Sequence, residues 1–245
     1  MEHRFIVIIF TYLNNNILEG ANLMNPQEVK ITYSGADPTA FGVLGLALVC
    51  FVASSAKLGF TNPKASALVA IWAILLGGLV QIMAGNIDFK KGNVFGGTVL
   101  SAYGFFWVGM GFSMAAMNGM FGPGMQAAVD PTMLGVVYVG YLFFSLFITV
   151  ASFEVNVPFM LMLILIDVLF ISLAAVSFKI GPVAVFAQLA GWSELIISLL
   201  GFYASGAIFF KNFYGREVLP LGKPLNLIKK APPVPAQNQN LKQAI

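Results

Sequence analysis

The sequence predicts an all-α integral membrane protein, folded as a bundle of six transmembrane helices. Only 9% of its 245 residues are charged, whereas soluble domains carry roughly 25%, and the mean hydropathy is +0.85. Apolar runs recur along the chain at about the 20-residue length that a helix needs to cross a bilayer. Short segments with Pro, Gly, Asp or Lys separate these runs. Because lipid offers no partner to free backbone groups, such spans must be helical.

Composition also excludes several functions. The net charge is +3 and the pI is about 9.0, but the basic residues lie at the ends of the apolar runs and in the tail, where they orient membrane proteins. We therefore expect no nucleic-acid partner. The single cysteine, Cys50, lies within an apolar run, and the single histidine, His3, lies at the N-terminus. We expect no disulfide framework, no metal site, no cofactor and no enzymatic activity.

Residues 1–36 are predicted to form an N-terminal cytoplasmic tail. Its apolar segment Phe5–Leu13 is too short to span, since a spanning helix needs about 20 residues. Met24 is a second candidate for the initiator methionine. Asp37-Pro38 then opens the first span, because Asp is a good N-cap and Pro suits the first helical position.

The transmembrane domain is predicted over residues 37–210, and residues 211–245 are predicted to be a basic, partly disordered cytoplasmic tail. Segments rich in Pro, Gly and Lys end each run, among them the hinge Ile87–Asn93 and the breaker Gly119–Gly124. The six predicted spans are residues 37–56, 65–86, 95–117, 133–152, 158–178 and 183–210.

Lysine and arginine give the predicted orientation. Of the 13 basic residues, ten lie in the tails and in the loops on the same side, while only Lys57, Lys64 and Lys179 lie on the other side. Because basic loops stay in the cytoplasm, we expect a multi-pass protein of the cell (plasma) membrane with both termini cytoplasmic.

Two carboxylates lie within predicted spans, Asp167 near the middle of the fifth and Glu194 near the middle of the sixth. A charge at the bilayer centre costs about 2.5–3.5 kcal/mol on insertion scales, and no Lys or Arg is expected at their depth. Both should therefore face the bundle interior. Two readings remain open: proton coupling, or a protonated carboxyl that hydrogen-bonds between helices.

Other polar and small residues mark inner helix faces. Gly97, Ser101 and Gly104 share one side of the third span, and Gly201 with Ser205 forms a small-xxx-small pair, which is typical of close helix packing. Gln81, Thr98, Ser101 and Tyr103 are hydrogen-bonding groups that a lipid-facing helix does not need. They are candidate contacts for a small anion, although aromatic residues near span ends also form interfacial belts.

Several stretches together resemble the acetate uptake transporter family. The hinge and its flanks (QIMAGNIDFKKGNVFGGTVLSAYGFFW, Gln81–Trp107) resemble that family closely. The opening DPTAFGVLGL resembles its NPAPLGLxGF signature, YGREVLPLG is similar to its closing GRxxLPLG, and LAGW (Leu189–Trp192) resembles its motif in the sixth span. The resemblance covers about residues 36–224.

This resemblance implies a homohexamer in which each protomer carries acetate, other short monocarboxylates or succinate through its own path. It also implies a Phe–Tyr–Leu constriction, whose positions fall on Leu46, Tyr103 and Ile166. Two of the three are thus replaced by aliphatic residues, which alters the expected width. Helix-end groups near Asp37, Pro38 and Gly42 would form the pore mouth, with Asp37 standing where the family has Asn.

The sequence therefore predicts an acetate permease with a narrow hydrophobic constriction, working as a proton symporter or as an anion channel. Gln81 and Tyr103 would supply transient hydrogen-bond donors, and conduction requires that binding be weak enough for release. The alternative is a membrane acetate sensor or scaffold that signals through its cytoplasmic tail. An intramembrane enzyme would need Asp167 and Glu194 to meet across a pocket.

Overall fold

The chain divides into two units, residues 1–34 and Gly35–Ile245. The computed structural model describes residues 35–62 and 66–228, all within the second unit. Most of the predicted N-terminal tail, including Phe5–Leu13, and the end of the C-terminal tail from residue 229 onward therefore lie outside the described residues.

Six helical spans are long and apolar enough to cross a membrane, which confirms the predicted fold class. Five of them are single helices, and the second span consists of three consecutive segments. The helices are α2 (Thr39–Lys57), α3 (Ser66–Trp72), η2 (Ala73–Val80), α4 (Gln81–Lys90), α5 (Val94–Met117), the short α6 (Pro123–Ala128), α7 (Pro131–Ser152), α8 (Val157–Phe178) and α9 (Val183–Tyr214).

Two predicted boundaries were wrong. The second span continues to Lys90, so the predicted hinge Ile87–Asn93 shrinks to the three residues between α4 and α5. The last helix continues to Tyr214 and not to residue 210, because the aromatic residues after Phe210 continue the helix until Gly215 adopts a left-handed conformation with φ 66°. Glycine ends helices in this way since it lacks a Cβ.

Polar side chains begin the helices at the ends of the bundle. Asn93 Oδ1 accepts a hydrogen bond from the Gly96 amide at 3.1 Å, and Asn156 Oδ1 accepts one from the Phe159 amide at 3.1 Å. Asp130 caps α7 in the same manner, at 2.9 Å from the Thr132 nitrogen. These caps satisfy amides that the helix itself leaves free.

The middle of the second span is a π-helix, η2, of eight residues. In a π-helix each amide bonds to the carbonyl five residues earlier, and such wide turns are rare and concentrated at functional sites. Gln81 follows immediately after η2, so the π-helix determines the direction in which this side chain points.

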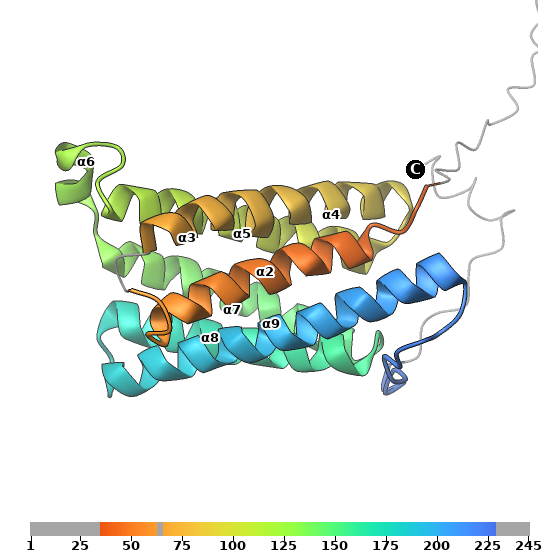
Figure 1. Ribbon diagram of the computed structural model, residues 1–245. Helices are drawn as coiled ribbons and strands as arrows, with labels where there is room; N and C mark the ends of the chain where they lie inside the picture. The colour runs from red at the N-terminus through yellow and green to blue at the C-terminus, as the bar shows by residue number, and fades with distance from the viewer. Residues whose placement is uncertain (1–34, 63–65, 229–245) are drawn as a thin grey trace, which may run out of the picture. The chain divides into compact units, whose positions relative to one another are not determined.

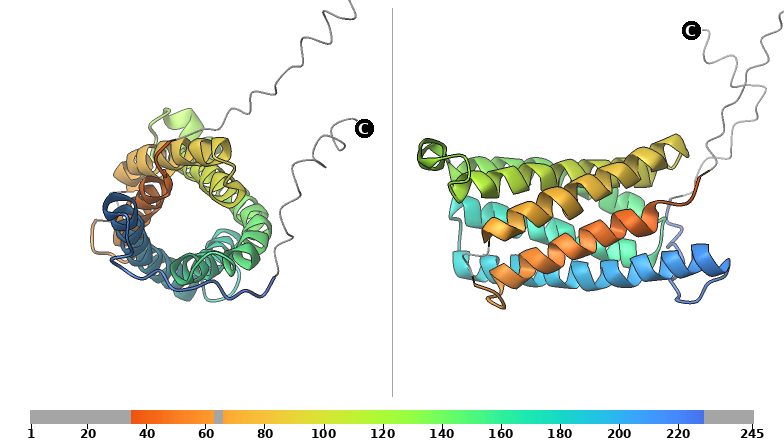
Figure 2. Two further views of the ribbon diagram at one scale, coloured as in Figure 1. Left: turned by 90° about the vertical axis from the view of Figure 1, so that its right-hand side faces the viewer. Right: turned by 45° about the horizontal axis from the view of Figure 1, so that its top comes forward.

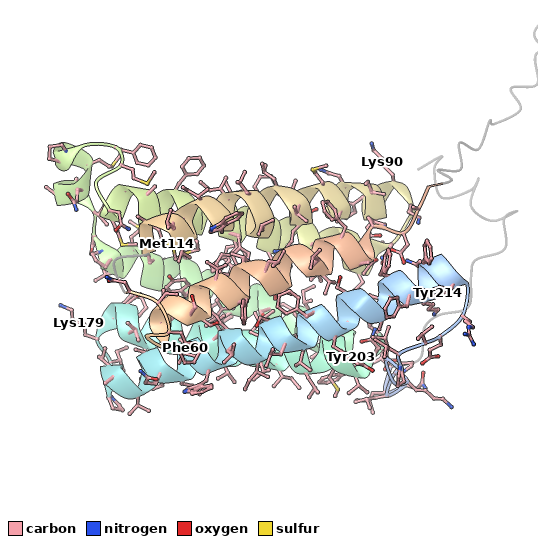
Figure 3. All side chains as sticks on the ribbon, in the orientation of Figure 1. Phe60, Lys90, Met114, Lys179, Tyr203 and Tyr214 are labelled. Atoms are coloured by element: carbon pink, nitrogen blue, oxygen red, sulfur yellow. The ribbon has the colours of Figure 1, made fainter. Side chains whose placement is uncertain are left out.

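The helices lie side by side and form a ring when viewed along their length (Figure 1, Figure 2). Around the ring the order is α5, the α3–η2–α4 span, α2, α9, α8 and α7. The backbones of α5 and α7 come close at few points, and aromatic side chains pack across the space between them. Lys179, Phe60 and Met114 lie toward one end, and Lys90 and Tyr214 toward the other (Figure 3).

Small residues set the helix spacing, as predicted. A Cβ added to Gly104 would lie 2.7 Å from Ile82 Cγ1, and one added to Gly201 would lie 2.9 Å from Ala47 Cβ. Ser205 donates a hydrogen bond of 2.7 Å to the Ala40 carbonyl. Close approach through Gly and Ser is the usual packing of membrane helices, and here it brings α5 onto α4 and α9 onto α2.

Candidate transport path

Four of the predicted site residues, Leu46, Gln81, Tyr103 and Ile166, line one cavity within the ring. Its volume is about 20 Å³, which is room for roughly one water molecule. We call this cavity the neck. Its remaining lining is apolar and comes from α2, α5 and α8: Val43, Val99, Leu100, Phe159, Met162 and Leu163.

The neck has two polar side chains, each held by one hydrogen bond. The Tyr103 hydroxyl donates to Ser145 Oγ at 2.9 Å, and Gln81 Nε2 donates to the Gly77 carbonyl at 2.7 Å. Gln81 Oε1 is buried and has no hydrogen-bond partner among the described residues. The exposed wall of the neck is nevertheless apolar, because the Tyr103 hydroxyl and the Gln81 amide nitrogen are turned to these partners.

A larger cavity of about 360 Å³ opens beside the neck, and we call it the Asn93 vestibule. Val99, Leu100 and Phe159 line both the neck and this vestibule, so the two spaces are neighbours. Its polar lining includes Asn93 and Asn156, the residues that cap α5 and α8, together with Glu154. Amides at helix N-termini favour anions.

A second cavity, of about 350 Å³, is lined by Lys57 together with small and apolar residues of α2, α3 and α5. We call it the Lys57 vestibule. Lys57 ends α2, whose first residue, Thr39, lines the Asn93 vestibule, so the two vestibules lie at opposite ends of this helix. The lining is Ala53, Ala56, Lys57, Val69, Met114, Met117 and Asn118.

Glu194 is paired with Lys57, contrary to the prediction that no basic residue reaches its depth. Lys57 Nζ lies 2.7 Å from Glu194 Oε1 and 2.8 Å from Oε2. The pairing arises because Gly191, one turn before Glu194, lets α9 approach the end of α2: a Cβ on Gly191 would lie 2.8 Å from Leu58 Cδ2. Glu194 lies well inside α9, and the lysine that reaches it comes from the last residue of α2.

Asp167 is buried between α7 and α8. Its Oδ2 accepts a hydrogen bond of 2.7 Å from Thr149 Oγ1, while its Oδ1 is buried without a partner among the described residues. Since Asp167 is bonded to α7 and Glu194 to α2, the structure does not join the two carboxylates in one hydrogen-bonded pair.

The other predicted residues lie outside the neck lining. Ser101 faces α4, because a Cβ on Gly85 would lie 2.3 Å from its Oγ, and Thr98 is half-buried. Pro38 and Gly42 are buried, and Gly42 packs against Leu100. The exposed Asp37 lines a groove between α2 and α9, and accepts hydrogen bonds from Thr39 and Asn212.

Three residues with a clear role in this geometry were missed: Lys57, Ser145 and Thr149. Ser145 and Thr149 lie four positions apart in a largely apolar stretch of α7, a spacing that places two hydroxyls on one face. This signal was present in the sequence. The partners of these hydroxyls, Tyr103 and Asp167, depend on tertiary packing and could not be read from it.

A sequence profile of the GPR1/FUN34/yaaH family matches residues 21–216. The chain belongs to the GPR1/FUN34/yaaH family. This confirms the resemblance to the acetate transporters, and the family together with the six apolar helices identifies a multi-pass membrane protein.

Several known proteins align with most of the chain. The succinate-acetate/proton symporter SatP of Escherichia coli K12 is 29% identical, covering 77% of this chain and 96% of that protein. Ammonia transport outward protein 2 of Saccharomyces cerevisiae is 29% identical, covering 69% of this chain and 59% of that protein. The solved bacterial acetate channel SatP superposes with a TM-score of 0.69 at 26% identity, covering 77% of this chain and all of that one.

Proposed function

We propose that this protein is a membrane permease for acetate and related short carboxylates, which cross the bilayer through the neck. The observation that carries the proposal is that four predicted site residues line the neck, a cavity of about 20 Å³: Leu46, Gln81, Tyr103 and Ile166. Along the helices the neck lies between the Asn93 vestibule and the Lys57 vestibule, both of which are much larger. Similarity to acetate permease A of Emericella nidulans, which is 31% identical over 56% of this chain and 48% of that protein, supports the substrate class.

The geometry suits a small, partly apolar anion. Removing water from a carboxylate is expensive unless hydrogen bonds replace it. Tyr103 and Gln81 line the neck, and a small turn of either side chain would offer its hydroxyl or amide to the solute. The methyl group of acetate would pack against Leu46 and Ile166. Because the polar groups are few, binding stays weak enough for the solute to leave again.

Expansion of the neck is part of this proposal. A space for one water molecule does not admit acetate, so side chains around the neck must move during passage. The structure then corresponds to a closed state. Met162 and Leu163 line the neck on α8, and flexible side chains such as Met adapt readily to a passing solute.

We further propose that the protein is a homohexamer of the plasma membrane with both termini in the cytoplasm. Large exposed apolar side chains on the outer faces, such as Phe147 and Phe105, are available to lipid or to neighbouring protomers. The excess of Lys and Arg at the Asn93 end supports this orientation. Native mass spectrometry and accessibility of introduced cysteines would measure assembly and orientation.

Uptake of labelled acetate into proteoliposomes tests the transport proposal. Uptake above that of empty vesicles is expected, saturating with acetate concentration. Absence of uptake, while the reconstituted protein still binds acetate, would favour the sensor alternative. Uptake of labelled methylammonium without uptake of acetate would assign an ammonium-type substrate, as the name of the yeast relative suggests for that protein.

A further inference from the structure

The ion pair between Lys57 and Glu194 lies at a cavity that the neck does not explain. Lys57 lines the Lys57 vestibule, and its ammonium bonds to both oxygens of the Glu194 carboxylate, at 2.7 and 2.8 Å. The two side chains differ in exposure: Lys57 is 27% exposed and Glu194 only 2%. The cation therefore reaches the vestibule, while the anion is buried behind it.

The remaining lining of this vestibule suits the apolar end of a short carboxylic acid. Ala53, Ala56, Val69, Met114 and Met117 supply apolar surface, and Lys57 supplies the only charge among the lining residues. An amide is present on Asn118, whose Nδ2 donates to the Met114 carbonyl. A carboxylate that binds here would thus direct its charged group to Lys57 and its methyl group to the methionines.

The buried carboxylate controls whether Lys57 is available. While Glu194 is charged, the ammonium cannot leave it, because a buried carboxylate without a partner is strongly unfavourable. Once Glu194 takes up a proton, it no longer needs the ammonium. The flexible four-carbon stem of lysine then lets the charge turn to an anion in the vestibule.

We propose that Lys57 and Glu194 form a joint binding site for one proton and one short carboxylate, in which protonation of Glu194 releases Lys57 to bind the substrate. The proton comes from the vestibule water and resides on Glu194, so the site is neutral both before and after the two bind. This inference rests on the proposed function, and it names the step that links carboxylate binding to protons at one mouth of the path.

The other titratable groups near Glu194 do not take its place as the partner of Lys57. The elements packed against α9 are α2 and α8, which contribute Cys50 and Lys57 from α2 and Asp167 from α8. Cys50 and Tyr138, the latter on α7, lie close enough to Glu194 to interact with its charge. Asp167 is hydrogen-bonded to Thr149 on the other side of α8 from this pair. Among these groups, only Lys57 bonds to Glu194 in the described structure.

Proton uptake on acetate binding tests the inference directly. Purified protein in nanodiscs, in weak buffer with a pH-indicator dye, is mixed with sodium acetate adjusted to the same pH. The wild type should take up about one proton per bound acetate. Glu194→Gln should bind acetate without proton uptake, because its amide is neutral at every pH. Lys57→Met should weaken acetate binding by about tenfold or more, since it removes the charged partner.

Matched variants control for charge and for folding. Lys179→Met removes an exposed lysine at the same end of the bundle, and Asp130→Asn removes an exposed carboxylate while keeping a good N-cap; both should behave like the wild type. The double variant Lys57→Met/Glu194→Gln removes the pair without leaving a buried charge, and it should fold but lack the site. Gel filtration of each variant verifies folding.

Unchanged proton uptake in Glu194→Gln, or unchanged acetate binding in Lys57→Met, would overturn the inference. Neither result requires transport, so this experiment is separate from the test of the proposed function. If the wild type transports acetate while these variants keep its proton dependence, the transport proposal is supported and the joint-site proposal is refuted. If the variants respond as expected but vesicles show no uptake, the joint-site proposal is supported and the transport proposal is refuted.

Discussion

The Tyr103 hydroxyl donates a hydrogen bond of 2.9 Å to Ser145 Oγ, and this bond joins α5 to α7, two helices whose backbones come close at few points. Both side chains are buried. Tyr141 adds a second link between these helices through its bond of 3.1 Å to the Ala102 carbonyl. Since Tyr103 also lines the neck, the bond that orients the phenol at the constriction also contributes to closing the helix ring.

Tyr103→Phe tests the contribution of the hydroxyl to transport. The ring would keep its contacts with Phe144 and Phe170, so only the hydrogen-bonding atom is lost. We expect the initial rate of acetate uptake to fall about tenfold, the usual value of a hydrogen bond to a charged group. Ser145→Ala, which frees the hydroxyl without removing it, should reduce uptake less. Equal rates for wild type and Tyr103→Phe would exclude the phenol from the path.

Ile166→Ala tests whether the neck limits substrate size. Ile166 is 4% exposed and lines the neck, whereas Ile164 on the same helix is 39% exposed and faces outward. Removing the Ile166 side chain should widen the neck and raise succinate uptake relative to acetate, with a stability loss of about 2–5 kcal/mol. Ile164→Ala is the control and should change neither ratio nor melting temperature. A ratio that rises equally in both variants would argue against a neck at this position.

Asp167→Asn separates packing from proton coupling at this residue. The amide oxygen can still accept the hydrogen bond of Thr149, and the change removes a buried charge whose Oδ1 has no partner among the described residues. We expect uptake within about twofold of wild type, which corresponds to less than 1 kcal/mol. Thr149→Val should lower thermal stability by about 1–3 kcal/mol, because the carboxylate loses its donor. Loss of the pH dependence of uptake in Asp167→Asn would instead assign proton coupling to Asp167.

Gly104→Ala tests the spacing between α5 and α4. An added Cβ would lie 2.7 Å from Ile82 Cγ1 and 3.0 Å from the Ile82 nitrogen, so the helices must separate. Overpacking of this kind typically costs about 1–3 kcal/mol. Gly109 lies on the same helix with no atom within 4 Å of the added Cβ, and Gly109→Ala should leave the melting temperature unchanged or raise it. Melting in detergent, followed by tryptophan fluorescence, compares the two.

Asp37→Ala tests a pH-dependent contribution at the start of α2. Partial burial alone raises the pKa of Asp37, but hydrogen bonds from the Thr39 hydroxyl and amide and from Asn212 outweigh it, so the pKa lies below its ordinary value of 3.8. A carboxyl with a lowered pKa stabilises the fold above that ordinary value, and the contribution disappears as pH falls through the folded pKa. The variant should be less stable at pH 7 by about 1 kcal/mol at most, given the exposure of the cap.

The contradicting result for this variant concerns the pH trend. The difference in melting temperature between wild type and Asp37→Ala should narrow as the pH falls below 3.8. A difference that stays constant across this range would show that the Asp37 charge does not contribute to helix capping.

Sequence reasoning recovered the fold because hydrophobic length and helix-breaking residues are local signals. Asp130-Pro131 and Asn156 begin α7 and α8 through bonds within three residues, and such bonds are visible in the sequence. The pairing of Lys57 with Glu194 is different, because 137 residues separate the two. Their meeting depends on how α9 lies against α2, which no local pattern encodes.

Not all of the predicted site residues line the neck, for a related reason. The alignment of motifs placed Leu46, Tyr103 and Ile166 at one constriction, and they line one cavity. Ser101 shares the same polar character but faces Gly85 on α4, because residues 101 and 103 differ by about 200° around a helix. Composition therefore identified polar residues, while the helix rotation decided which of them reach the neck.

Because η2 has wide turns, the length of this segment matters for the evolution and engineering of this chain. Each residue advances an α-helix by about 100°. Deleting one residue between Ala73 and Val80 would therefore rewind this stretch and rotate the preceding helix, α3, relative to Gln81. Either the glutamine would leave the cavity or Gly77 and Gly78 would lose their places against Trp107 and Val108. Outside Gly77 and Gly78, where an added Cβ would clash with Trp107 or Val108, this short segment should therefore tolerate substitutions better than changes in length.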